Sequence, residues 1–172
     1  MTPELTRTIA LDTIGSAPRT LRIDADDAER QALARRFDLI SLDRLSADLT
    51  FAVEATNVRV HGKLEAALTQ KCAATGRPVD ARIKEPIDLR FIPPVDLTPG
   101  QDEIEIEADA CDEIEHDGRV VDLGEAVAQT LGLALDPYPR SSDADAVLKE
   151  AGVLGEHETG PFAALKGLFS KE

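Results

Sequence analysis

The chain has 172 residues, enough to bury the core of one domain, and its 42% apolar and 30% charged residues are typical of globular proteins. Aromatic residues make up only 3%, so the core must consist mainly of aliphatic side chains. No stretch has the length of a membrane span, and the first 18 residues lack the basic and then apolar pattern of a signal peptide. We therefore expect a cytoplasmic protein with no membrane partner.

The net charge of −14 is distributed unevenly along the chain. Residues 59–90 carry seven Lys or Arg against four Asp or Glu, a net charge of +3, whereas residues 91–172 carry five against nineteen, a net charge of −14. An acidic protein is not drawn to nucleic acid regardless of sequence, because phosphate binding needs a positive field. We therefore expect no DNA partner, although the basic middle segment can make a local contact. Acidic charge that only keeps the protein soluble is an equally simple explanation.

The first half of the chain predicts one helix among several strands. Asp26 followed by Glu29 has the pattern of a capping box, which places a helix over residues 27–37. Apolar and polar residues alternate in the other segments, as in half-buried strands. These strands cover residues 6–13, 20–24, 45–53, 58–69, 79–83 and 87–91. Pro86 separates the last two, which indicates a bulge or an edge position because proline cannot donate to a ladder.

The second half predicts one more strand and one more helix. Residues 102–109 alternate again, and the Asp-Gly pair in residues 116–119 indicates a hairpin turn. Asp122 and Glu125 predict a second capping box, for a helix over residues 123–134.

Short turns between the strands favour antiparallel pairing. We therefore expect an α+β fold: a curved antiparallel β-sheet, with barrel-like closure left open, flanked by two or three helices. We also expect a single domain over residues 1–140 and a loosely packed C-terminal extension over residues 141–172.

The sequence contains no common catalytic or phosphate-binding motif. Its three histidines lie in unrelated contexts, and Cys72 and Cys111 have neither the paired spacing of metal ligands nor the pattern of a disulfide framework. We therefore expect no catalytic residues, no metal site and no cofactor, and a protein that binds a macromolecule without being an enzyme.

A basic row is the first candidate binding surface. Residues of the same parity share one face of an unbroken strand, which predicts a row of cations along residues 58–71. The candidate RNA-contacting residues are Arg59, His61, Lys63, Lys71 and, in the following turn, Arg77. Arg82 and Lys84, beyond that turn, are not assigned to the row. No aromatic side chains are available here for base stacking, so contact with the RNA backbone is the form of binding that remains. A solvated face without a ligand explains the same pattern.

An acidic segment is the second candidate surface. Residues 102–117 contain nine Asp or Glu, and opposed potentials would steer a basic protein toward them. The candidate residues for a basic partner are Glu105, Glu107, Asp109, Glu113 and Glu115. A strand with one solvated face is the alternative.

Three segments, in this order and spacing, resemble the YceD family, the large ribosomal RNA subunit accumulation proteins of bacteria and plastids. The first is the strand VHGKLEA of residues 60–66, which runs into a cysteine and a short turn. The second is the capped helix with its Pro-x-Pro exit, and the third is the ending PFAAL of residues 161–165. The positions that match the family motifs are Cys72, Pro78, Asp122, Pro137, Pro139 and Phe162.

The resemblance implies a ribosome biogenesis factor needed for the accumulation or processing of large-subunit (23S) ribosomal RNA. The implied partner is large-subunit precursor RNA or a basic large-subunit ribosomal protein, and no catalytic residues are established for the family. Many relatives have Cys-x-x-Cys at the turn, where this chain has Thr75 as the second residue. A metal-linked role is therefore not carried over. A small-ligand carrier built on a β-barrel and an RNA-processing enzyme with an unfamiliar site are the alternatives.

Overall fold

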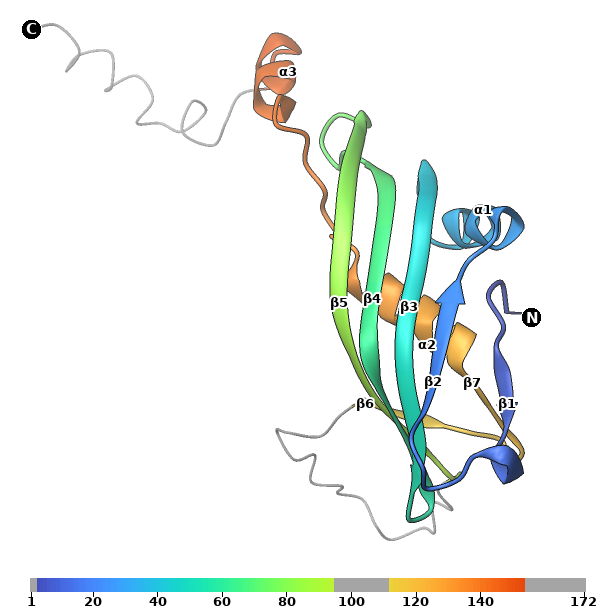
Figure 1. The fold of residues 1–172 in the computed structure, drawn as a ribbon. Helices are drawn as coiled ribbons and strands as arrows, with labels where there is room; N and C mark the ends of the chain where they lie inside the picture. The colour runs from blue at the N-terminus through green and yellow to red at the C-terminus, as the bar shows by residue number, and fades with distance from the viewer. Residues whose placement is uncertain (1–2, 95–111, 154–172) are drawn as a thin grey trace, which may run out of the picture.

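A five-stranded sheet forms the larger part of the fold (Figure 1). The computed structural model describes residues 3–94 and 112–153. The strands lie in the order β2 (Arg19–Asp24), β3 (Ser41–Glu54), β4 (Asn57–Lys71), β5 (Pro78–Ile92) and β6 (Asp112–Glu115). β2 to β5 are antiparallel, as expected from their short connections.

The long strands β3, β4 and β5 follow the alternation of the sequence. Their apolar positions, such as Leu49, Val60 and Leu89, are buried on the inner face, while charged residues point outward. Pro86 does not break β5, because the β4–β5 register continues through the pair of Lys63 and Pro86 without a bulge. In the described part of the chain, β6 pairs only with Leu89 to Ile92, so no described strand pairs with Pro86 on that side, as at the edge position that was one of the two expected for it.

Helix α2 (Leu123–Ala134) lies across the inner face of the sheet (Figure 1). Its buried residues Leu123, Val127 and Leu131 join the inner side chains of the strands in one aliphatic core. Gly124 is needed where α2 meets the N-terminal segment, because a Cβ there would lie 2.7 Å from the Leu5 carbonyl oxygen. The helix predicted over residues 123–134 is confirmed.

A small second sheet pairs the start of the chain with the residues before α2. β1 (Thr8–Ala10) is antiparallel to β7 (Val120–Asp122), and a 3-10 helix, η1 (Leu11–Thr13), follows β1. The strand predicted over residues 6–13 is therefore shorter than expected. The hairpin predicted at residues 116–119 is wrong, because β6 pairs with β5 and β7 pairs with β1. The Asp-Gly turn is present, with Gly118 at φ +81° and two backbone N–H groups bonded to Asp117.

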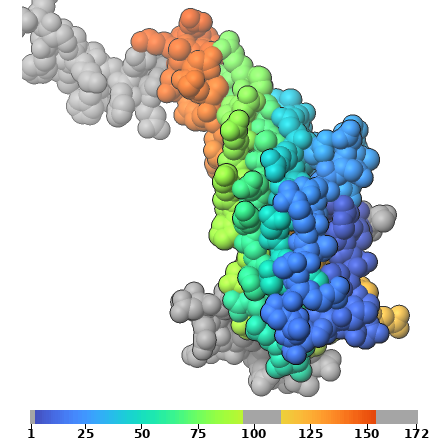
Figure 2. Space-filling model, in the orientation of Figure 1, coloured from blue at the N-terminus to red at the C-terminus, as the bar shows by residue number. Residues whose placement is uncertain are grey.

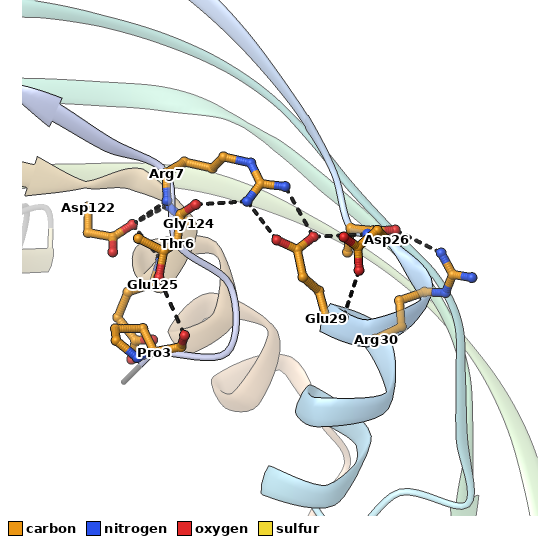
Figure 3. A network of polar contacts seen from close by, with 10 residues as sticks. Pro3, Thr6, Arg7, Asp26, Glu29, Arg30, Asp122, Gly124 and Glu125 are labelled. Atoms are coloured by element: carbon orange, nitrogen blue, oxygen red, sulfur yellow. Dashed lines mark hydrogen bonds and ion pairs between the residues drawn. The ribbon is translucent and has the colours of Figure 1, made fainter. Parts of the chain in front are cut away.

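A polar network ties the N-terminal segment to both helices (Figure 3). Arg7 binds Glu29 of α1 (Asp27–Arg36) through two hydrogen bonds, of 2.7 and 3.1 Å. Glu29 also completes the predicted capping box with Asp26, and the Arg7 hydrogen bond lowers the pKa of its carboxyl. Asp122 Oδ1 accepts hydrogen bonds from the backbone N–H groups of Arg7, Gly124 and Glu125. One carboxylate thus caps α2 and holds the N-terminal segment against it.

The α+β class is confirmed, with three α-helices among the described residues. Barrel-like closure, which the sequence left open, is not confirmed, and the expectation of a purely antiparallel sheet is corrected. The sheet is open and does not form a barrel. It is also mixed, because β6 runs parallel to β5. Residues 95–111, between β5 and β6, lie outside the described part of the chain, and so does the strand predicted over residues 102–109.

The third helix, α3 (Ala144–Glu150), lies within the extension expected over residues 141–172. The domain boundary at residue 140 stays a prediction. None of the helices in the described ranges is both long enough and apolar enough to cross a membrane.

Candidate functional site

The outer face of the sheet is open to solvent along β3, β4 and β5 (Figure 2). Because these strands are long and unbroken, their outward residues form continuous rows across the sheet. One row joins Arg22, Asp48, Lys63 and Pro86, and the next joins Thr20, Thr50, His61 and Asp88. In the first of these rows the acid Asp48 thus lies between two cations, Arg22 and Lys63.

The predicted basic row is present on this face. Arg59, His61 and Lys63 lie on consecutive outward positions of β4. Lys71 ends the same strand, and Arg77 lies in the turn before β5. The structure thus brings the first three together and places the other two at the end of the sheet.

Four of these five residues are already paired with acids. Arg59 contacts Asp88 at 2.8 Å, and Lys71 contacts Asp38 at 2.6 Å. Lys63 is 3.9 Å from Asp48, which also binds Arg22. Arg77 forms an ion pair with Asp143, just before α3. Exposed pairs of this kind contribute little stability, about 0–1 kcal/mol each, so an incoming phosphate can compete with the acids.

Three cations that were not assigned to the row form a second group, which we call the outer basic cluster: Arg44, Arg82 and Lys84. Arg44 on β3 and Arg82 on β5 flank Ala67 of β4 on opposite sides. The small Ala67 side chain leaves a recess of about 390 Å³ between them. Among the described residues, neither arginine has an ion-pair partner, while Lys84 lies 3.6 Å from Glu65.

The sequence carried a signal for only part of the outer basic cluster. Apolar and polar residues alternate in the strand predicted over residues 79–83, so Arg82, and Lys84 with the same parity, belong to its polar face. The β3–β4 register shifts between Leu42 and Arg44, so Arg44 comes directly after a β-bulge. It also precedes the strand predicted over residues 45–53. A bulge changes which face a residue occupies, and the periodicity of the sequence did not indicate it.

The acidic segment is described only in part. Glu113 and Glu115 lie on β6, and Glu113 pairs with Arg90 of β5 at 3.3 Å. Glu115 is exposed and has no ion-pair partner among the described residues. The other three candidates, Glu105, Glu107 and Asp109, lie outside the described residues.

The Cys72 turn brings two motif segments together. Cys72 is buried, and its Sγ accepts hydrogen bonds from the N–H and Oγ of Ser141 at 3.4 and 3.5 Å. The next residue, Ala73, donates its N–H to the Pro139 carbonyl oxygen at 2.7 Å. A hydrogen bond from the Thr75 side chain, together with those from Ser141, lowers the pKa of the Cys72 thiol to about 6. The hydroxyl groups of Thr75 and Ser141 thus donate hydrogen bonds to the Cys72 sulfur.

Four other positions that match the family motifs lie at or near the ends of strands and helices. Pro78 opens β5 opposite Lys71, Asp122 caps α2, and Pro137 and Pro139 lie in the segment that leaves this helix. Phe162 lies outside the described residues. Within residues 3–94 and 112–153, no group of three or more His, Cys, Asp or Glu side chains could hold a metal ion. The open sheet does not form the closed β-barrel that the small-ligand carrier requires.

Comparison with known proteins gives one match. The family model described as large ribosomal RNA subunit accumulation protein YceD matches residues 60–169. This range includes β4 from residue 60 onward, the Cys72 turn, β5 and α2, and it is more than half of the chain. No curated protein and no solved structure matches the chain.

Proposed function

The chain belongs to the YceD family of large ribosomal RNA subunit accumulation proteins, and on this premise we propose that it is a non-catalytic, cytoplasmic ribosome biogenesis factor that binds large-subunit (23S) precursor RNA. The family implies the role in accumulation of large-subunit ribosomal RNA. The binding surface is the outer face of the sheet, and its centre is the outer basic cluster.

The placement of Arg44, Arg82 and Lys84 around Ala67 supports this proposal. Three cations on neighbouring strands of an otherwise acidic protein create a local positive potential. Arginine can bind a phosphate group through two parallel hydrogen bonds, and two arginines on either side of a recess can hold one phosphate between them. No aromatic side chain lies on this part of the face to stack on a base, so the contact is to the backbone of structured RNA.

The predicted row of Arg59, His61 and Lys63 extends this surface along β4. Arg59 and Lys63 face acids within the sheet, so they contribute less net attraction than unpaired cations. We therefore expect the row to determine how far the RNA contact extends along β4. The outer basic cluster should supply most of the salt-dependent affinity for RNA.

The test compares two triple variants of equal charge. Arg44/Arg82/Lys84→Gln neutralises the outer basic cluster, while Arg35/Arg119/Lys149→Gln neutralises three exposed cations on α1, in the turn before β7 and on α3. Each variant is sedimented with large-subunit precursor particles on sucrose gradients at low and moderate salt. The cluster variant should leave the particles, and its salt slope should fall by about 1.5–2, because each phosphate contact contributes roughly 0.7–0.9 and the cluster contacts two phosphates, one held by the two arginines and one by Lys84. Equal losses in both variants would show that net charge, not this surface, drives binding.

A second candidate partner is a basic large-subunit ribosomal protein. The net charge of −14 in residues 91–172 favours it, and Glu115 is an exposed acid on β6. Replacing Glu105, Glu107, Asp109, Glu113 and Glu115 by Gln should then abolish association with particles, while the cluster variant should retain it. The opposite result supports the RNA contact.

A further inference from the structure

A groove with an apolar floor lies between helix α2 and the strands β5 and β6. It has a volume of about 380 Å³. Leu89 of β5 and Ile114 of β6 line its sheet side, while Ala126, Thr130 and Leu133 are among the residues that line its helix side. The three helix residues recur at intervals of four and three positions, so they form one stripe along α2. The volume is at the small end of the range for ligand pockets, so the groove accommodates a few side chains.

Leu133 gives the groove an exposed apolar wall. It is 83% exposed, the largest exposed fraction among the large apolar side chains of the described residues. A single exposed leucine is common on a protein surface. This one, however, lines a groove together with Leu89 and Ala126, which are buried in the core. A side chain of a partner placed here would contact both the floor and Leu133, and would remove apolar surface from water.

Two carboxylates flank this floor on the inner side of the sheet. Glu85 lies opposite Leu64 of β4, and Asp112 lies opposite Leu89, so both acids share the face of buried leucines. Both acids are exposed, and neither has an ion-pair partner within residues 3–94 and 112–153. The third acid of the groove, Glu113, is already bound to Arg90.

The lining of the groove determines which partner it can bind. Among the described residues it contains three acids and no lysine, arginine or histidine. Phosphate groups and acidic peptides are therefore repelled, which excludes RNA from this surface. Protein interfaces commonly consist of an apolar centre with a polar or charged rim. A protein segment that carries an apolar side chain between cations is complementary to this groove in both respects.

We propose that the groove between α2 and the strands β5 and β6 docks a basic, amphipathic segment of a partner protein. An apolar side chain of the segment packs against Leu89, Ile114 and Leu133, and a Lys or Arg next to it binds Glu85 or Asp112. The groove is on the inner side of the sheet, whereas the outer basic cluster is on the opposite face. The proposal therefore does not rest on RNA binding, and one molecule can hold RNA and a protein segment at the same time.

A peptide titration of the full chain tests the proposal. The probe is the peptide Gly-Lys-Leu-Arg-Leu-Lys-Gly with blocked ends, which alternates cations and leucines. Two control peptides carry Glu in place of each cation or Gly in place of each Leu. Backbone amide chemical shifts of the isotopically labelled protein are followed by NMR, because they locate the contact as well as measure its affinity. We expect saturable shifts at the amides of Leu89, Ile114 and Leu133, and much weaker binding of both control peptides.

Two sets of variants separate the groove from the net charge. Glu85→Gln with Asp112→Asn should weaken binding of the probe about threefold to tenfold, as expected for the loss of two exposed ion pairs. The matched control is Asp12→Asn with Glu54→Gln, which neutralises two exposed acids that have no ion-pair partner in the described part of the chain. It should change the affinity by less than about twofold, because distant exposed charges are screened by salt.

Leu133→Gln tests the apolar contact, and should weaken binding about tenfold. Because Leu133 is exposed, this variant should keep the amide spectrum of the wild type outside the groove.

Three results would overturn the proposal. The first is the absence of saturable shifts at the groove amides, which would mean that the groove is closed to a partner. The second is an equal loss of affinity in the groove and control charge variants, because net charge alone would then explain binding. The third is a shift of the Leu133 amide when the protein is diluted without peptide, because a second copy of the chain would then fill the groove. None of these results bears on the outer basic cluster, which all the variants leave intact.

Discussion

Gly62 lies where the backbone of β3 leaves no room for a side chain on β4, which gives a prediction about stability. A Cβ at this position would lie 2.1 Å from the Asp48 carbonyl oxygen of β3. Because the clash involves backbone, the strands must separate by roughly 1 Å to reach an ordinary contact. The separation weakens one or two ladder hydrogen bonds of about 1 kcal/mol each and adds overpacking strain of about 1–3 kcal/mol. Gly62→Ala should therefore cost about 2–4 kcal/mol.

Thermal unfolding followed by circular dichroism measures this cost. For a chain of this length, about 2–4 kcal/mol corresponds to a Tm lower by roughly 5–15 °C. Gly15→Ala is the matched control, because a Cβ there meets nothing closer than 3.9 Å. If Gly62→Ala unfolds at the same temperature as Gly15→Ala, the steric reasoning is wrong and β4 accepts a side chain at this position.

Three further predictions concern single contacts of Gly124, Cys72 and Glu125. Gly124→Ala should push the N-terminal segment off α2 and speed exchange of the Arg7 amide, which NMR would detect; an unchanged rate would contradict the close packing. Thr75→Val should raise the pKa of the Cys72 thiol above about 6, measured from the Cβ chemical shift of Cys72 against pH. The hydrogen bond from Arg36 lowers the pKa of Glu125, so this pair stabilises the fold above the unfolded pKa of about 4.3 and loses its effect as pH falls through the folded value. Urea unfolding of Glu125→Gln should therefore show about 1 kcal/mol less stability at neutral pH and little difference in strong acid.

The sequence predicted the parts of the fold that local patterns determine. Alternation of apolar and polar residues located β3, β4 and β5, because one face of each strand is buried in the aliphatic core. Asp26 and Asp122 marked the starts of α1 and α2. The second capping box was only half right, because the Glu125 side chain binds Arg36 on α1. A capping-box motif is local, so it cannot indicate that Glu125 binds the side chain of the distant Arg36 instead of the backbone N–H of Asp122.

Pairing between distant segments could not be predicted in this way. The parallel β5–β6 pair and the β1–β7 pair depend on how the chain returns to the sheet, which periodicity does not report. The candidate site shows the same limit. Parity correctly placed Arg59 and Lys63 on one face, but only the strand register reveals that Asp88 and Asp48 are beside them. The register also shows that Arg44 and Arg82 flank Ala67.

The β1–β7 pair has a consequence for synthesis of the protein. Arg7 and its acceptor Asp122 are 115 positions apart, and β1 has no other strand partner among the described residues. At about 5–20 residues per second, the ribosome needs on the order of ten seconds to make the intervening chain. During that time β2 to β5 can fold on the nascent chain while β1 has no partner. β1 thus leaves the ribosome before β2 to β5 but pairs only after them.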